Sequence, residues 1–252
     1  YVQPYPNNIH QTIKIALKAG KKVLASGSPC MISSLLRFLA AETISTENLT
    51  TIDIICSNVP SPAYWHDFIT HKKFENLLWV DFRDKRYSRQ CTTQCYYTKE
   101  KGRIVDNTWG RIFNSFLACN PACFKCRYKK MERVSDITIG DFWGIEKIRP
   151  DLDASNGINI ALVNTNKGQT LFDSIVNDTY HLEIDKGQAE YYRQKSLNEN
   201  WQIPKEYESF WKRYSNRGFV SAQKKYFDEP YYQKIARFLK RAIHYFLRLV
   251  RN

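Results

Sequence analysis

The chain has 252 residues, of which 43% are hydrophobic and 25% charged, the balance of an ordinary globular protein. No apolar run approaches the ~18 residues of a membrane-spanning helix and no signal-peptide pattern opens the chain, so the sequence predicts a cytoplasmic protein. The formal net charge of +13 is concentrated in residues 205–252, which hold 12 Lys and Arg against 4 Asp and Glu. This charge permits nucleic acid, anionic lipid or anionic cofactors as partners and does not choose among them.

Seven cysteines are present, an odd number without a secretory signal, which argues against a disulfide framework. The count favours a reducing compartment in which thiols bind metal. The chain begins with Tyr1 rather than Met, so we also expect a further segment upstream.

The first seventy residues alternate helix and strand. Apolar spacing and turn residues predict, in order, a helix over 9–19, a strand over 22–25, a helix over 31–41, a strand over 49–55 and a helix over 63–72. This alternation is typical of a parallel α/β sheet, in which ligands gather beyond the carboxyl ends of the strands. Cys30 and Cys56 each follow a predicted strand, so we expect both at that edge, although a lone cysteine is more often a buried structural thiol.

The remainder predicts a hairpin and a helical end. The expected elements are a strand over 77–82, a hairpin over 90–105, a helix over 107–117, strands over 158–163 and 180–184, a helix over 168–176 and mainly helix from 188. The predicted fold is α/β, with a mostly parallel sheet flanked by helices, a hairpin insertion and a helical C-terminal region. We place the domain boundary between the α/β domain (1–187) and the helical region (188–252). Cys91 and Cys95 alternate onto one face of the hairpin, which favours a packed pair over a metal site.

Candidate functional residues are most concentrated in residues 119–144, CNPACFKCRYKKMERVSDITIGDFWG. Cys123 and Cys126 form a Cys-x-x-Cys pair, whose two thiolates one backbone turn can aim at a single metal centre. Residues 135–144 alternate apolar and polar side chains, which predicts a short strand entering a tight turn. In a purely structural role, Trp143 would lie in the core and Asp136 and Asp141 would cap backbone amides; in a functional role, these residues would face a cofactor.

Several motifs, in this order, resemble those of one known family. They are Gly27-Ser28-Pro29-Cys30, CSNVPSP from Cys56 to Pro62, Phe82-Arg83-Asp84-Lys85, Cys123-Phe124-Lys125-Cys126 and SDITIGDFWGIE from Ser135 to Glu146. Over roughly residues 1–227 the chain is similar to the C-terminal domain of the coenzyme F420 (deazaflavin) hydrogenase/dehydrogenase beta-subunit family, and it resembles the bacterial polysaccharide-biosynthesis type. Ser57 and Asn58 depart from the usual His-Gly of that family.

This resemblance implies an iron–sulfur flavoprotein oxidoreductase with FAD and a 4Fe–4S cluster, a redox partner protein or ferredoxin-like domain, and a small-molecule substrate. The predicted cluster ligands are Cys30, Cys56, Cys123 and Cys126, with Cys119 as the substitute if one assignment fails. The residues expected to bind the flavin and its phosphates are Ser135, Asp136, Gly140, Asp141, Trp143, Gly144, Arg127 and Lys129. Glycines permit close backbone approach to a cofactor, and basic side chains offset phosphate charge.

Two other functions stay open. A protein that kept this fold and lost its cofactors would serve as a scaffold or partner subunit, and Ser57 and Asn58 are the best support for it. A zinc protein would use the same thiols as a closed four-cysteine site and bind nucleic acid through its basic, aromatic C-terminal third. No segment matches a known nucleic-acid module, so the zinc alternative is the weaker of the two.

Residues 231–251 predict a basic amphipathic helix without an acidic residue. Its apolar positions keep helical spacing and its lysines and arginines supply charge, as in helices that lie on an anionic membrane surface or an acidic partner. Packing against the domain, with the basic face in solvent, explains the pattern equally well.

Overall fold

The computed structural model describes residues 2, 8–86, 93–154, 157–185, 187–188 and 194–228. Cys91 and the helix predicted over 231–251 lie outside these ranges and stay predictions. The elements in chain order are α1 (Ile9–Lys18), β1 (Val23–Gly27), α2 (Pro29–Ala41), β2 (Leu49–Ile54), α3 (Pro62–His71), β3 (Leu77–Asp81), β4 (Cys95–Thr98), β5 (Gly102–Val105), α4 (Thr108–Ser115), η1 (Pro121–Lys125), β6 (Ile137–Asp141), α5 (Ile145–Ile148), β7 (Asn159–Val163), α6 (Asn166–Ile175), η2 (Val176–Asp178), α8 (Lys195–Asn198) and α9 (Tyr207–Tyr226).

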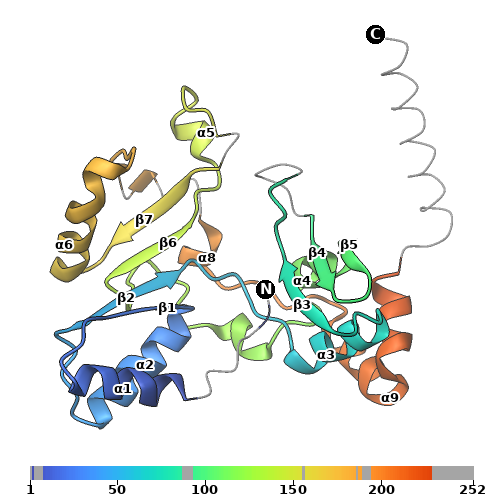
Figure 1. The fold of residues 1–252 in the computed structure, drawn as a ribbon. Coiled ribbons are helices and arrows are strands. Elements are labelled where there is room, and N and C mark those ends of the chain that lie inside the picture. Colours follow the sequence, from blue (N-terminus) through green and yellow to red (C-terminus); the bar gives the residue numbers. More distant parts are fainter. Residues whose placement is uncertain are drawn as a thin grey trace.

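The larger sheet has the strand order β1-β2-β6-β7. β1, β2 and β6 run parallel and β7 pairs antiparallel with β6, which confirms the predicted α/β fold with a mostly parallel sheet (Figure 1). Helices α1 and α2 cover one face because their apolar residues recur every three to four positions. The core between these helices and the sheet consists of Ile13, Leu17, Ala25, Ile32, Leu35, Leu39 and Leu49.

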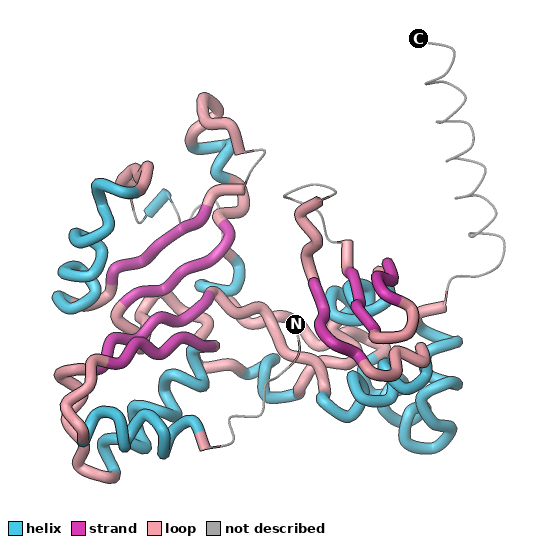
Figure 2. Tube along the Cα trace, viewed as in Figure 1, coloured by secondary structure: helices cyan, strands magenta, loops and turns pink. Residues whose placement is uncertain are grey.

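A second, antiparallel sheet has the order β3-β4-β5. β3 therefore pairs with the predicted hairpin rather than with the parallel sheet. An aromatic core lies under it, in which Tyr64 and Phe68 of α3, Tyr96 of β4, Trp109 of α4 and Phe210 of α9 are fully buried. Helix α9 comes from the C-terminal region and packs in the same core as α3. Figure 2 shows the two sheets on opposite sides of the connection between β2 and α3.

The strand predicted over 180–184 is wrong, because residues 180–184 adopt no regular structure. Tyr180 and Leu182 are both exposed, so the alternating side chains that suggested a strand have no surface to cover. A strand also requires a neighbour for its backbone N–H and C=O groups, and none of the described strands pairs with this segment.

Gly168, in the first turn of α6, lies where that helix meets the start of β6. A Cβ atom at this position would stand 2.2 Å from the carbonyl oxygen of Asp136. The obstacle is backbone, which cannot rotate away. We therefore expect Gly168→Ala to lower the free energy of unfolding by about 2 kcal/mol or more.

Urea unfolding checks this expectation. Gln169→Ala, at the next and exposed position of α6, is the matched control and should change the free energy of unfolding by less than about 0.5 kcal/mol. Equal urea midpoints for Gly168→Ala and Gln169→Ala would contradict the expectation. They would show that α6 can move away from β6 to accept the added Cβ without loss of stability.

Candidate functional site

Four cysteines meet near the carboxyl ends of β1 and β2. Cys30 is in the first turn of α2, three residues after β1, and Cys56 follows β2 by two residues. Cys123 lies in η1 and Cys126 directly follows it. Cys123, Cys30 and Cys126 are all near enough to raise the pKa of the Cys56 thiol, so the structure places the four predicted ligands in one region. Cys95 lies elsewhere, buried in β4 with its thiol donating to Asp84 Oδ2 at 3.0 Å.

The segment with the Cys-x-x-Cys pair is fixed to the loop that carries Cys56. Pro60 and Cys119 form an isolated β-bridge, and the Asn120 N–H donates to the Val59 carbonyl at 2.8 Å. The Asn120 side chain then accepts from the N–H of Ala122 and begins η1. These backbone contacts hold residues far apart in the sequence at one place.

The thiols differ in their protonation. Burial, then the neighbouring thiols, raise the pKa of Cys56 to about 12. A hydrogen bond from Cys119 lowers the pKa of Cys123 to about 6, helped by the Val59 amide and Lys129, and the pKa of Cys119 rises in turn. Metal ligation requires thiolates, so binding at Cys56 would release a proton, whereas the lowered pKa of Cys123 favours its thiolate form as a ligand.

Lys129 is a buried amine beside these thiols. Its side chain is 7% exposed, and its Nζ has no hydrogen-bond partner among the residues that the structure describes. Burial lowers the pKa of Lys129, whereas Cys126, Cys123, Cys56 and Cys119 oppose that shift. An ammonium in such a place is costly unless negative charge faces it.

Residues after 190 complete the site, and sequence reasoning did not single them out as site residues. Asn200 accepts a hydrogen bond from the backbone N–H of Cys126 at 3.0 Å, and the Tyr207 hydroxyl donates to the Cys119 carbonyl at 2.8 Å. The Trp201 ring centroid lies 5.5 Å from Lys129 Nζ. The aromatic richness of this region was visible in the sequence, but its direction toward the cysteines was not.

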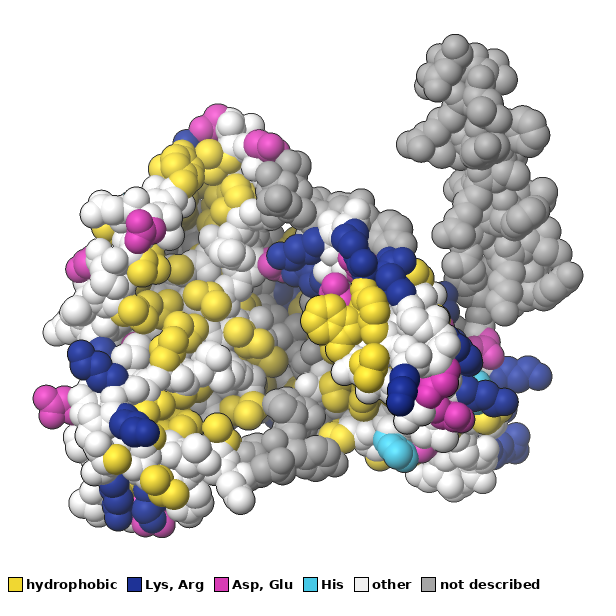
Figure 3. Space-filling model, in the orientation of Figure 1, with side chains coloured by type: hydrophobic (Ala, Val, Ile, Leu, Met, Phe, Trp, Pro, Cys, Tyr) yellow, Lys and Arg dark blue, Asp and Glu magenta, His cyan; other side chains and the backbone are white. Residues whose placement is uncertain are grey.

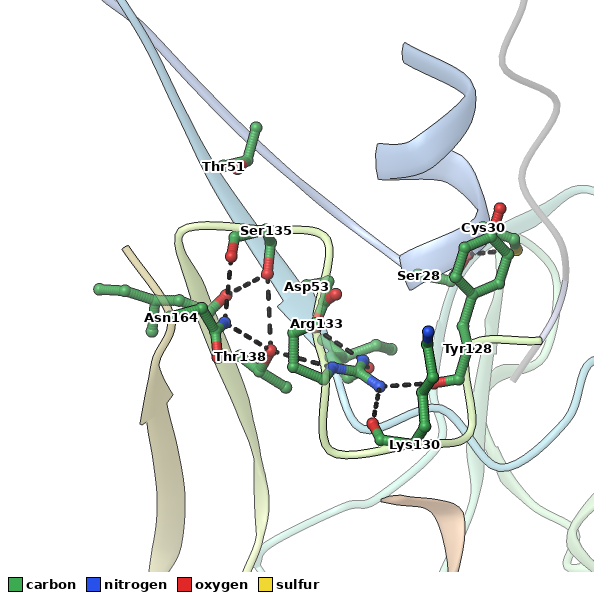
Figure 4. Close-up of polar contacts among 12 residues, drawn as sticks. Ser28, Cys30, Thr51, Asp53, Tyr128, Lys130, Arg133, Ser135, Thr138 and Asn164 are labelled. Atoms are coloured by element: carbon green, nitrogen blue, oxygen red, sulfur yellow. Dashed lines mark hydrogen bonds and ion pairs between the residues drawn. The ribbon is translucent and has the colours of Figure 1, made fainter. Parts of the chain in front are cut away.

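A buried ion pair ties the loop after Cys126 to the sheet (Figure 4). Arg133 Nη2 lies 2.9 Å from Asp53 Oδ1 of β2, and the two side chains are 1% and 0% exposed. The guanidinium also donates to the Thr138 hydroxyl and to the carbonyls of Tyr128, Lys130 and Ile54. The carbonyls of Tyr128 and Lys130 flank Lys129, so this one side chain positions the loop that carries the buried amine.

Ser135 and Asp136 are engaged within the protein. The Ser135 hydroxyl donates to the Ile137 carbonyl at 2.8 Å. Asp136 accepts from the backbone N–H and the hydroxyl of Thr51, both at 2.8 Å, and from the Thr165 hydroxyl at 2.7 Å. Burial raises the pKa of Asp136, but these hydrogen bonds outweigh it and the net shift is downward. The structural alternative, a carboxylate that caps a backbone amide, is confirmed for Asp136.

The turn after β6 contains the other predicted flavin residues. The space beside Gly140 is filled by the Ile55 side chain, which a Cβ would approach to 2.8 Å, whereas Gly144 has φ +87° and begins α5. Trp143 is 64% exposed, so the core alternative for this residue is wrong. Asp141 pairs with Arg83 at 2.6 Å, which links the end of β6 to the segment after β3.

The face of the parallel sheet opposite α1 and α2 carries exposed apolar side chains. They include Leu24 of β1, Ile54 of β2 and Ile139 of β6, and Figure 3 shows apolar side chains gathered over this sheet. Trp143 stands exposed two residues beyond the end of β6. A flat, apolar ring system fits such a surface, because it would remove the exposed area from water.

The donor set suits a soft metal centre. Four thiols, the Val59 amide and the buried Lys129 ammonium fit an anionic iron–sulfur cluster, whose charge and sulfur atoms require cations and N–H donors. Arg127 is exposed and open to an anionic group. Among the described ranges, no three His, Cys, Asp or Glu side chains are already arranged closely enough to hold a metal ion.

These features define an α/β protein with a thiol-rich site at the carboxyl edge of a parallel sheet. The family model for the C terminus of the beta subunit of coenzyme F420 hydrogenase/dehydrogenase matches residues 20–189. The chain belongs to this family, and its context is that of redox enzymes. No curated protein sequence matches the chain.

Among solved structures, the chain aligns with part of the F420-reducing NiFe hydrogenase complex from Methanosarcina barkeri, in a study of xenon derivatization. The TM-score is 0.40 and the identity 12%, over 85% of this chain and 64% of that chain. This likeness is too low to carry any inference about function. No helix in the described part of the chain is long and apolar enough to cross a membrane.

The buried Arg133–Asp53 pair generates a stability prediction. Arg133→Met leaves the Asp53 carboxylate buried without its partner, so we expect the free energy of unfolding to fall by about 3–5 kcal/mol. The double variant Arg133→Met/Asp53→Leu removes the stranded charge and should recover a substantial part of the loss. Arg149→Met, which breaks the exposed Arg149–Asp151 pair, should cost at most about 1 kcal/mol. Equal losses in the free energy of unfolding for Arg133→Met and Arg149→Met, measured by denaturant unfolding, would contradict a special role for the buried Arg133–Asp53 pair.

Proposed function

We propose that this chain is the cluster- and flavin-binding part of an iron–sulfur oxidoreductase that uses FAD and a 4Fe–4S cluster. The observation that carries the proposal is the grouping of Cys30, Cys123 and Cys126 near Cys56 at the carboxyl edge of a parallel sheet, with the buried amine of Lys129 beside Cys56, Cys123 and Cys126. Membership in a hydrogenase and dehydrogenase family supports it.

Each part of the site has a distinct role in this proposal. Cys30, Cys56, Cys123 and Cys126 ligate the cluster, while the Cys119 thiol donates to the Asn120 carbonyl at 3.3 Å. Cys119 remains the substitute ligand. Because four thiolates around zinc are also anionic, the geometry alone does not separate a cluster from zinc, and metal content does.

We place the flavin against the exposed apolar side chains at the ends of β2 and β6. Trp143 is the residue available for ring contact, Gly144 and Asp141 lie beside it, and Arg127 is free to face phosphate. Ser135 and Asp136 instead fix the start of β6 through their internal hydrogen bonds, and Gly140 leaves room for the Ile55 side chain. When bound, flavin and cluster would together supply hydride exchange and single-electron transfer.

The substrate and partners follow from the family context. Electrons would pass between a flavin, deazaflavin or nicotinamide donor and a small-molecule substrate, through a redox partner protein or a ferredoxin-like domain. The resemblance to polysaccharide-biosynthesis members points to a substrate in cell-surface sugar metabolism, handled in the cytoplasm. A scaffold without cofactors is the alternative that Ser57 and Asn58 favour, and Asn58 is buried with an unpartnered Oδ1 among the described residues.

The cluster prediction concerns metal content after anaerobic purification or reconstitution. We expect about four iron and four sulfide per chain. Cys30→Ser, Cys56→Ser, Cys123→Ser and Cys126→Ser should each lose most of both, because a serine oxygen is a hard ligand that matches iron–sulfur clusters poorly.

Cys95→Ser is the matched control, since Cys95 is a buried thiol outside the site, and it should keep full iron and sulfide content. Zinc without sulfide in the wild-type chain would support the zinc alternative. Loss of iron in Cys95→Ser with retention in Cys30→Ser would move the metal site to the hairpin.

The flavin prediction concerns affinity for FAD. We expect one tightly but non-covalently bound FAD per chain after reconstitution, released by denaturation and identified by chromatography. Trp143→Ala should weaken FAD binding about tenfold, because an aromatic contact contributes about 1.4 kcal/mol. Trp79→Ala removes a similarly exposed tryptophan from the second sheet and should leave the affinity unchanged. No flavin in the wild-type chain, even with excess FAD, rejects the flavin assignment.

A further inference from the structure

We propose that Lys129 is the internal counter-charge of the four-thiol site and sets the reduction potential of the cluster held there. This inference rests on the proposed function, because it assigns a role to a side chain of the same site. It changes the role expected from the sequence, in which Lys129 offset the phosphates of a flavin.

The first observation is the burial of an unsatisfied ammonium. Lys129 is the buried lysine of a loop in which Lys125, Arg127 and Lys130 are all exposed. Its Nζ has no hydrogen-bond partner within the described residues. Ammonium groups are strongly hydrated, and taking one from water costs several kcal/mol unless a negative group compensates.

The second observation is what surrounds this ammonium. The thiols of Cys126, Cys123 and Cys56 act on the charge of Lys129 more than any other titratable groups do. The amine also lies over an aromatic ring, with Nζ 5.5 Å from the Trp201 centroid. Lys195 lies over the same ring at 4.4 Å. The indole ring stabilises a cation at this position, and the thiols would do so once metal ligation deprotonates them.

The third observation is that the position of Lys129 is enforced. Arg133 donates to the carbonyls of the residues on both sides, Tyr128 at 2.6 Å and Lys130 at 3.4 Å. Asn200 holds the Cys126 amide and so fixes the start of the same loop. The backbone on both sides of Lys129 is therefore fixed by contacts that do not involve its amine.

A phosphate-binding role conflicts with this placement. Phosphate groups are large and strongly hydrated, and a lysine that binds them presents its amine at an accessible surface. Arg127 meets that requirement and Lys129 does not.

A buried positive charge beside the cluster shifts its reduction potential in one direction. Reduction adds one negative charge to the cluster, so a nearby buried cation stabilises the reduced form more than the oxidised form. Solvent does not screen a buried pair as it screens exposed charges. Lys129 therefore raises the reduction potential, and removal of its charge lowers it.

The test is a redox titration of the reconstituted cluster, followed by electron paramagnetic resonance. Lys129→Gln keeps an unbranched polar side chain, one atom shorter, and removes its charge. At a fixed potential near the wild-type midpoint, we expect at least a tenfold lower ratio of reduced to oxidised cluster, which for one electron corresponds to about 59 mV. Lys129→Arg keeps the charge and should titrate close to the wild type.

Lys125→Gln is the matched control. It removes the same charge from between Cys123 and Cys126, but at an exposed position where water screens it, so its midpoint should stay near that of the wild type. An unchanged midpoint in Lys129→Gln, or equal shifts in Lys129→Gln and Lys125→Gln, overturns the inference.

Loss of the cluster from a variant or from the wild-type chain also tests the inference. Loss of the cluster in Lys129→Gln with retention in Lys129→Arg supports the counter-charge, because Arg keeps the positive charge of Lys129 and Gln does not. Loss in both variants indicates a packing role and overturns it. A wild-type chain that takes up no iron and sulfide overturns the proposed function itself, which is a separate result from an unmoved potential in a loaded protein.

Discussion

The structure depends on one buried guanidinium. Arg133 has five N–H donors, and each finds an acceptor: Asp53, Ile54, Thr138 and the carbonyls of Tyr128 and Lys130. A charge removed from water must be satisfied in this way, and the requirement fixes the partners' positions. Arg133 thereby holds three pieces at once: the end of β2, the start of β6 and the loop after the Cys-x-x-Cys pair.

That constraint explains how the thiols gather. β1 and β2 are neighbours and parallel, so the residues after them emerge at the same edge of the sheet. The bridge between Pro60 and Cys119 brings η1 to that edge, and Arg133 keeps the following loop there. The C-terminal part then closes the arrangement through Asn200 and Tyr207, which hold the backbone at Cys126 and Cys119.

The charges of the site follow from the same placement. In the loop held against the sheet Lys129 is buried, while Arg127 is exposed. The buried amine lies near the thiols and over the Trp201 ring, and it favours negative charge at Cys123, whose pKa is lowered. The other open face, with Ile54, Ile139 and Trp143, is apolar instead, and the two surfaces suit two different cofactors.

The sequence by itself determined the parallel α/β order and predicted a set of four cysteine ligands, because strand ends and a Cys-x-x-Cys spacing are local features that periodicity and turn residues reveal. It could not determine that β3 joins the hairpin, nor that residues 180–184 lack a strand partner, since pairing is decided by neighbours far along the chain. Only the tertiary structure decided that Ile55 fills the space beside Gly140, that Lys129 is buried and that Asn200 supports Cys126. Such contacts join segments that are distant in the sequence, 85 residues apart in the case of Thr51 and Asp136, and no local pattern encodes which of them form.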